Sequence, residues 1–106
     1  SVTRESLGID GSDELKVLAP ASSIFYSAPS PTEQAYAKEG DTVSIDQTLC
    51  LMEAMKMFSP LTLKSLNSQG NALYDPQKQY RIVRIHNAEG QQVNQGDLLF
   101  VIKPLS

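Results

Sequence analysis

The sequence predicts an all-β domain, a flattened antiparallel β-sandwich or barrel of two quasi-symmetric four-stranded halves. Two observations predict this fold. From residue 15 onward, short apolar runs alternate with turn residues, and no window of about twelve residues holds an apolar stripe with the period of a helix. In addition, residues 39–52 are similar to residues 89–102 at a constant offset of 50 positions, from 39 to 89.

The expected strands are short and separated by turns. They are residues 15–19, 24–26, 35–37, 48–53, 57–63, 80–86 and 98–103. Pro29 and Pro31 exclude the stretch between residues 27 and 31 from a central strand, because proline lacks the N–H group that a sheet ladder needs. This stretch is therefore expected to be a loop.

The repeat predicts how the two halves are built. Four pairs are identical between the copies: Glu39 and Glu89, Gly40 and Gly90, Val43 and Val93, Leu49 and Leu99. The three positions that follow, 50–52 and 100–102, are apolar in both copies. Each copy indicates a glycine turn, a short hydrophobic anchor, a second turn and a strand that enters the core. We therefore expect two similar halves packed face to face.

Composition narrows the class of protein. The chain has 106 residues, which is the size of one domain, and we expect residues 1–14, which hold few large apolar side chains, to be a linker or flexible terminus. Nine Lys and Arg against twelve Asp and Glu predict no nucleic-acid partner, and the longest apolar run, 98–102, predicts no membrane partner. One cysteine and one histidine argue against a metal site and against a self-contained enzyme. Cys50 is expected in the core and His86 at the surface end of a strand.

A tight hairpin is expected where the strands at 48–53 and 57–63 meet, with its turn near Met55-Lys56. The turn lacks the Asn-Gly or Asp-Gly pair that most easily adopts positive φ, so its residues serve something other than turn formation. Lys56 would be solvated at the tip, between two flexible methionines. From the residues alone, a plain exposed lysine remains open.

The segment Glu53-Ala54-Met55-Lys56-Met57 resembles the biotin-attachment motif of biotinyl domains in biotin-dependent carboxylases. The resemblance implies covalent biotin on Lys56, and it implies that Glu53, Ala54, Met55 and Met57 are recognised by biotin protein ligase. Lipoyl domains share this fold but usually lack the flanking methionines, so biotin is favoured over lipoate.

A second segment, from Phe25 to Pro31 and on to Tyr36, resembles the thumb of biotin carboxyl carrier proteins of acetyl-CoA carboxylase. The resemblance implies a thumb-like loop at residues 27–34 that lies close to the biotin. The thumb residues it assigns to the biotin site are Ser27, Ala28, Pro29, Ser30 and Pro31. An ordinary Pro/Ser surface loop is the alternative.

The chain departs from the family at residues 64–79, which look like an insertion. We expect this insertion to be a surface excursion near the pole opposite Lys56, with Leu66, Leu73 and Tyr74 pinning it to the body.

The resemblance implies that residues 15–106 are a biotinyl carrier domain, a non-catalytic component with no catalytic residues of its own. It would shuttle carboxybiotin between biotin carboxylase and carboxyltransferase, in acetyl-CoA carboxylase and fatty acid synthesis. Two alternatives stay open: the carrier of another biotin-dependent acyl-CoA carboxylase or decarboxylase, and an unmodified lipoyl-like interaction module. The implied location is the cytoplasm, or the plastid stroma if an upstream transit peptide has been removed.

Overall fold

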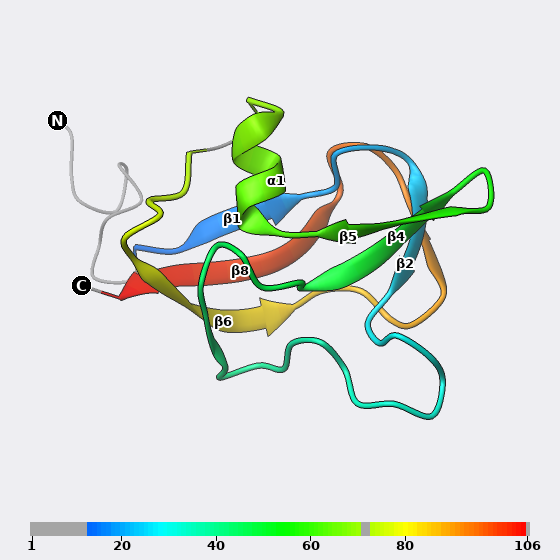
Figure 1. The fold of residues 1–106 in the computed structure, drawn as a ribbon, viewed down its shortest axis with the longest axis horizontal. Coiled ribbons are helices and arrows are strands. Elements are labelled where there is room, and N and C mark those ends of the chain that lie inside the picture. Colours follow the sequence, from blue (N-terminus) through cyan, green and yellow to red (C-terminus); the bar gives the residue numbers. More distant parts are fainter. Residues whose placement is uncertain (1–12, 71–72, 106) are drawn as a thin grey trace, which may run out of the picture.

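The computed structural model describes residues 13–70 and 73–105, and it consists of two four-stranded antiparallel sheets packed face to face (Figure 1). The predicted all-β sandwich is confirmed. Residues 1–12 of the expected linker lie outside the described residues, so that expectation remains a prediction. Within the described part of the chain, no helix has the length and apolar character needed to cross a membrane.

The elements follow one another as short strands with a single helix among them. They are β1 (Leu15–Leu18), β2 (Ser23–Tyr26), β3 (Thr42–Val43), β4 (Cys50–Ala54), β5 (Met57–Leu61), α1 (Leu63–Ser68), β6 (Gln79–Ile85), β7 (Gln91–Val93) and β8 (Leu98–Leu105). One sheet has the order β1-β8-β6-β3 and the other has the order β5-β4-β2-β7. If four is added to each strand number, with β1 following β8, the order β1-β8-β6-β3 becomes the order β5-β4-β2-β7. The sheets are therefore equivalent halves, as the repeat predicts.

The two copies of the repeat fold into the same turns. In each copy, two backbone N–H groups donate to a side-chain oxygen three residues later. The bonds are Lys38 to Asp41 at 2.9 Å, Ser44 to Gln47 at 3.0 Å, Ala88 to Gln91 at 2.9 Å and Asn94 to Asp97 at 2.8 Å. Gly40 and Gly90 have φ values of +94° and +76°, a region that glycine adopts without strain. Turns with the same hydrogen-bond pattern thus precede β4 and β8, and both strands enter the core in the same way.

The core lies between the sheets. Buried side chains alternate with less buried ones along β2, β4 and β6, whereas β8 buries four consecutive residues, 99–102. The rings of Phe25 and Phe100, one from each sheet, lie 6.0 Å apart between centroids. Cys50 is fully buried, which confirms its predicted core position. Burial raises the pKa of the Cys50 thiol to about 12, so the group stays protonated and unreactive at neutral pH.

Several predicted boundaries are wrong, each for a local reason. Residues 35–37 form no strand, because the Tyr36 N–H donates to the Ser27 carbonyl oxygen at 2.9 Å and so closes the base of the loop. The strands β3 and β7 contain two and three residues, which is too short for an alternating pattern to be visible. The strand expected at 57–63 ends at Leu61, where the chain turns into α1.

The helix α1 has six residues and was not expected, since it is too short to show an apolar period. Its start is capped by Thr62, whose side chain accepts from the Ser65 N–H at 2.9 Å. The expected insertion begins in this helix. Leu66 and Tyr74 are buried, as predicted, whereas Leu73 is 91% exposed, so the prediction that it pins the segment is wrong.

Candidate functional site

The hairpin of β4 and β5 ends in a two-residue turn at Met55 and Lys56. Ala54 pairs with Met57 across the strands, which leaves only those two residues in the connection. Their φ values are +53° and +65°, so both lie in the left-handed region. A side chain costs about 1 kcal/mol in that conformation, and the usual Asn-Gly pair avoids the cost. The fold therefore tolerates strain here to place a methionine and a lysine at the tip.

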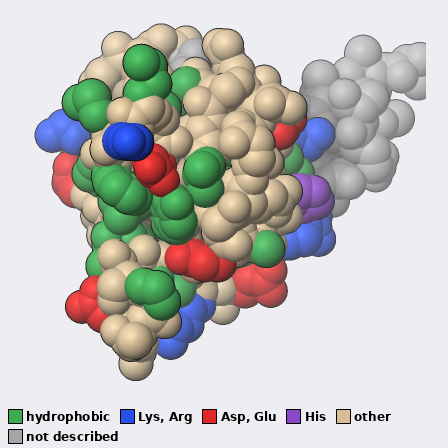
Figure 2. Space-filling view, turned by 90° about the vertical axis from the view of Figure 1, so that its right-hand side faces the viewer, with side chains coloured by type: hydrophobic (Ala, Val, Ile, Leu, Met, Phe, Trp, Pro, Cys, Tyr) green, Lys and Arg blue, Asp and Glu red, His purple; other side chains and the backbone are tan. Residues whose placement is uncertain are grey.

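The tip is surrounded by exposed apolar side chains. The exposed fractions are 95% for Met55, 72% for Met57 and 56% for Phe58, and Lys56 between the methionines is exposed as well. Figure 1 shows the hairpin projecting beyond the sheets, and Figure 2, which views this end, shows hydrophobic side chains gathered around exposed basic and acidic ones. Exposed methionines form an adaptable contact surface. An exposed lysine amine between two exposed methionines is suited to binding by another protein.

Glu53 is held in place on the outer face of the same sheet. Its Oε1 accepts a hydrogen bond from the Tyr26 hydroxyl at 2.7 Å, and this bond raises the pKa of Tyr26. The Tyr26 and Phe58 rings lie 5.6 Å apart between centroids, and Phe58 faces Glu53 across the strands. The three side chains thus form a cluster behind the tip, which stiffens the position of the Glu53 carboxylate.

Tyr26 and Phe58 were not predicted from the sequence to be parts of this cluster. A partial signal was present, because Tyr26 lies in the thumb-like segment and Phe58 follows the attachment motif directly. Their meeting depends on the pairing of β2 with β4 and of β4 with β5, which no local pattern reveals.

The thumb-like loop leaves β2 at Ser27 and is tied at its base. The Ser27 N–H and hydroxyl both donate to Oε1 of Glu89, at 2.5 and 2.6 Å. Nearer the tip, the Glu33 N–H donates to the Ser30 carbonyl oxygen at 3.2 Å. Pro29 and Pro31 are exposed, while Ala28 is buried at the base.

The structure places the thumb and the hairpin at the same end of the molecule, on different sides of β2 (Figure 1). Among the described residues, the thumb makes no hydrogen bond, ion pair or ring contact with residues 53–57. The predicted site residues thus share one end of the domain, and no polar or ring contact among the described residues joins the thumb to the motif.

In the part of the chain that the structure describes, no group of three or more His, Cys, Asp or Glu side chains converges in a way that could hold a metal ion. His86 is exposed just beyond β6, and its backbone N–H donates to the Leu99 carbonyl oxygen at 2.9 Å. It therefore lies at the surface end of a strand, as predicted.

Comparison with known proteins also finds similarity to proteins that carry biotin. Residues 15–65 match a biotin/lipoyl family model described as "Biotin-requiring enzyme". The biotin carboxyl carrier protein of acetyl-CoA carboxylase from Chlamydia trachomatis is 33% identical over 75 residues, which are 64% of this chain and 46% of that protein. The chloroplastic biotin carboxyl carrier protein 1 of acetyl-CoA carboxylase from Arabidopsis thaliana is 30% identical over 88 residues, which are 83% of this chain and 27% of that protein.

Among solved structures, a single-chain, multi-domain long-chain acyl-CoA carboxylase superposes with a TM-score of 0.61 at 25% identity, covering 86% of this chain and 7% of the other. The chain spans less than half the length of the curated relatives described above. The matched segment contains β1 to β5, with the hairpin and the thumb. Residues 15–65 thus match the biotin/lipoyl family model, and the chain resembles the biotin carboxyl carrier proteins of acetyl-CoA carboxylase.

Proposed function

We propose that this chain is the biotin carboxyl carrier domain of a biotin-dependent carboxylase, with biotin joined to the Lys56 amine by an amide bond. The observation that carries the proposal is the turn itself, where an exposed lysine stands between two exposed methionines at a strained hairpin tip. When bound, biotin supplies a ureido nitrogen that carries the carboxyl group. The domain supplies no catalytic residue and acts as a non-catalytic carrier.

The residues around the tip fit such an attachment. Amide formation requires the Lys56 amine to enter the active site of a biotin protein ligase, and a two-residue turn lets a lysine extend clear of the sheets. Met55 and Met57 offer that ligase an apolar grip on both sides. Glu53, fixed by the Tyr26 hydroxyl, offers a carboxylate in a constant position.

The placement of the hairpin also fits a carrier that visits two partners. The tip lies at the end of the molecule opposite the start of β1 and the end of β8 (Figure 1). It can therefore enter a biotin carboxylase and then a carboxyltransferase without obstruction from those strand ends. Tethering keeps the transferred group at a high effective concentration near each active site.

Acetyl-CoA carboxylase is the complex we favour, because the curated relatives described above carry that name and because the thumb-like loop is present. The carrier of another acyl-CoA carboxylase is the second candidate, and the likeness to a long-chain acyl-CoA carboxylase favours it. The relatives include bacterial and chloroplastic proteins, so we propose the cytoplasm or the plastid stroma as the location.

Mass spectrometry after co-expression with a biotin protein ligase tests the attachment. We expect the intact mass to rise by one biotin, and we expect Lys56→Arg to abolish the rise. Lys64→Arg, at an exposed lysine without flanking methionines, is the matched control and should keep it. Biotin that persists in Lys56→Arg would contradict the assignment, and an unchanged mass in the unmutated chain would favour an unmodified interaction module.

A pull-down with the biotinylated chain identifies the acceptor. Co-purification of a carboxyltransferase that acts on acetyl-CoA is the expected result. Recovery of a transferase for another acyl-CoA would move the assignment to the second candidate.

A further inference from the structure

A groove with a volume of about 390 Å³ begins beside the hairpin tip and ends at α1. Its hairpin side is lined by Met52, Ala54 and Ser59, which lie on one face of β4 and β5, because Met52 pairs directly with Ser59. Ser65 and Gln69 of α1 form the opposite wall. The groove therefore connects the expected attachment motif with α1, where the insertion that the sequence predicts begins.

The groove is within reach of a biotinylated Lys56. The lysine side chain and the valeryl chain of biotin together contain eleven bonds, which extend about 14 Å. Ser59 lies three residues from Lys56 along β5, a path of about 10 Å, and Leu61 lies about 16 Å away. The arm therefore carries the bicyclic head group past Ser59, and the head group itself extends from there toward Leu61 and the α1 wall.

The lining matches the chemistry of that head group. Met52, Ala54 and Pro60 offer an apolar floor for the thioether ring. The Ser59 side chain is exposed and its hydroxyl has no hydrogen-bond partner among the described residues, so it is free to donate to a ureido carbonyl oxygen.

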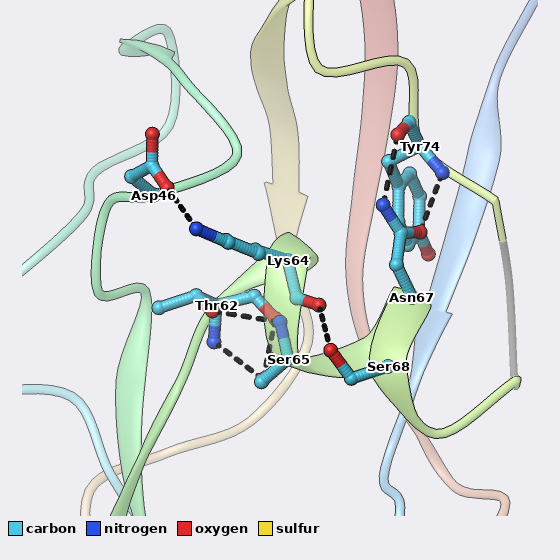
Figure 3. Close-up of polar contacts among 7 residues, drawn as sticks. All are labelled: Asp46, Thr62, Lys64, Ser65, Asn67, Ser68 and Tyr74. Atoms are coloured by element: carbon cyan, nitrogen blue, oxygen red, sulfur yellow. Dashed lines mark hydrogen bonds and ion pairs between the residues drawn. The ribbon is translucent and has the colours of Figure 1, made fainter.

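The α1 wall is rigid rather than reactive. The Ser65 hydroxyl donates to the Thr62 carbonyl oxygen at 2.7 Å and accepts from the Thr62 N–H at 3.2 Å, as Figure 3 shows. Lys64, on the same helix, pairs with Asp46 at 3.7 Å between Nζ and Oδ1. These contacts hold the first turn of the helix in place, so Ser65 shapes the groove while its own hydrogen bonds stay internal.

We infer that this groove is a resting site for the biotinyl arm of Lys56, occupied when the arm is in neither partner's active site. The inference rests on the proposed attachment of biotin. It puts the resting arm on the α1 side of the hairpin. The thumb extends from the sheets on the opposite side, as Figure 1 shows, so the resting arm lies away from it. The segment from Thr62 to Gln69 then serves to complete a cofactor site.

Amide chemical shifts of the ¹⁵N-labelled chain, compared before and after biotinylation, test the inference. Intact mass first establishes that biotin is attached to Lys56. We expect shift changes at Ser59, Ser65 and Gln69, and none at residues 28–33 of the thumb. Ser59→Ala should lower the ratio of docked to free arm about fivefold, the effect of one lost hydrogen bond, and so shrink the changes at Ser65 and Gln69.

The matched control is Ser68→Ala, which removes an exposed hydroxyl of α1 that bonds to the Lys64 carbonyl oxygen outside the groove. It should leave the shift changes as they are. Changes confined to residues 53–58 would overturn the inference, because the arm would then extend into solvent. Changes at the thumb would overturn it in favour of that loop. If no mass of biotin is gained at all, the proposed function fails first and the resting site fails with it.

Discussion

The two halves of the domain share their strand order and turns but differ in where a long connection leaves the sheets. Residues 27–41, the thumb side, correspond to the short connection at residues 86–90, and residues 62–78, which include α1, correspond to the short turn at residues 19–22. The thumb connection buries only Ala28 and Ala37, whereas the α1 connection buries Leu63, Leu66 and Tyr74. The thumb is therefore fastened at its base by hydrogen bonds, and the α1 connection forms part of the core.

The contacts of Tyr74 show how firmly the α1 connection is attached. Its N–H donates to Asn67 Oδ1 at 2.7 Å, and the Asn67 amide donates back to its carbonyl oxygen at 2.9 Å (Figure 3). Its ring lies edge-on to that of Tyr80, 5.9 Å between centroids. Burial raises the pKa of Tyr74. The two long connections thus differ in the apolar area that they bury. The α1 connection buries large side chains and is part of the structure, whereas the thumb buries little and is an appendage.

The largest effect is expected from Leu66→Ala, in the α1 connection. Because Leu66 is 1% exposed, its truncation leaves a cavity and should lower the free energy of unfolding by about 2–5 kcal/mol. Leu73→Ala, in the same connection but at an exposed position, should change it by less than about 0.5 kcal/mol. Urea unfolding measures both. Equal losses in the two variants would mean that α1 is an appendage like the thumb.

Features with a local signal could be predicted from the sequence, and features made by distant segments could not. The turn at Met55-Lys56 and the two sheets follow from a motif and a repeat that are visible in the chain. The helix α1 was missed because six residues are too few for a period, although Thr62 followed by Ser65 is a weak capping signal. The contact of Tyr26 with Glu53 depends on strand register, and the groove depends on three separate segments.

The next largest change in the free energy of unfolding is expected at the hairpin turn. Replacing Met55 and Lys56 by Asn and Gly puts the preferred residues at two positive φ values, so the free energy of unfolding should rise by about 1 kcal/mol. The same variant should take up no biotin. A double Ala variant at these positions keeps the strain and should give no such gain. A loss of stability with Asn-Gly, measured by urea unfolding, would show that Met55 or Lys56 makes contacts that stabilise the fold.

An effect of similar size but opposite sign is expected at the first of two glutamates that the repeat makes equivalent, and a smaller loss at the second. Glu89 accepts both the N–H and the hydroxyl of Ser27, whereas Glu39 accepts the Ile85 N–H at 3.0 Å. Glu89→Ala should lower the free energy of unfolding by about 1 kcal/mol, and Glu39→Ala by about half as much. Hydrogen exchange should speed up in residues 27–34 only in the Glu89 variant. Faster exchange of the thumb in both variants would contradict its attachment through Glu89.

The smallest change in stability is expected at the methionines beside Lys56. Met55 and Met57 are largely exposed, so Met55→Ala and Met57→Ala should each change the free energy of unfolding by less than about 0.5 kcal/mol. Met52→Ala, at a position 7% exposed in the same strand pair, should lower it by about 2–5 kcal/mol. The rate of biotinylation by a biotin protein ligase should show the opposite order among the folded variants, because only the exposed pair can contact that enzyme. A biotinylation rate that Met55→Ala and Met57→Ala leave unchanged would reduce the pair to solvent-facing side chains, and the proposed grip on Lys56 would have to come from Glu53 alone.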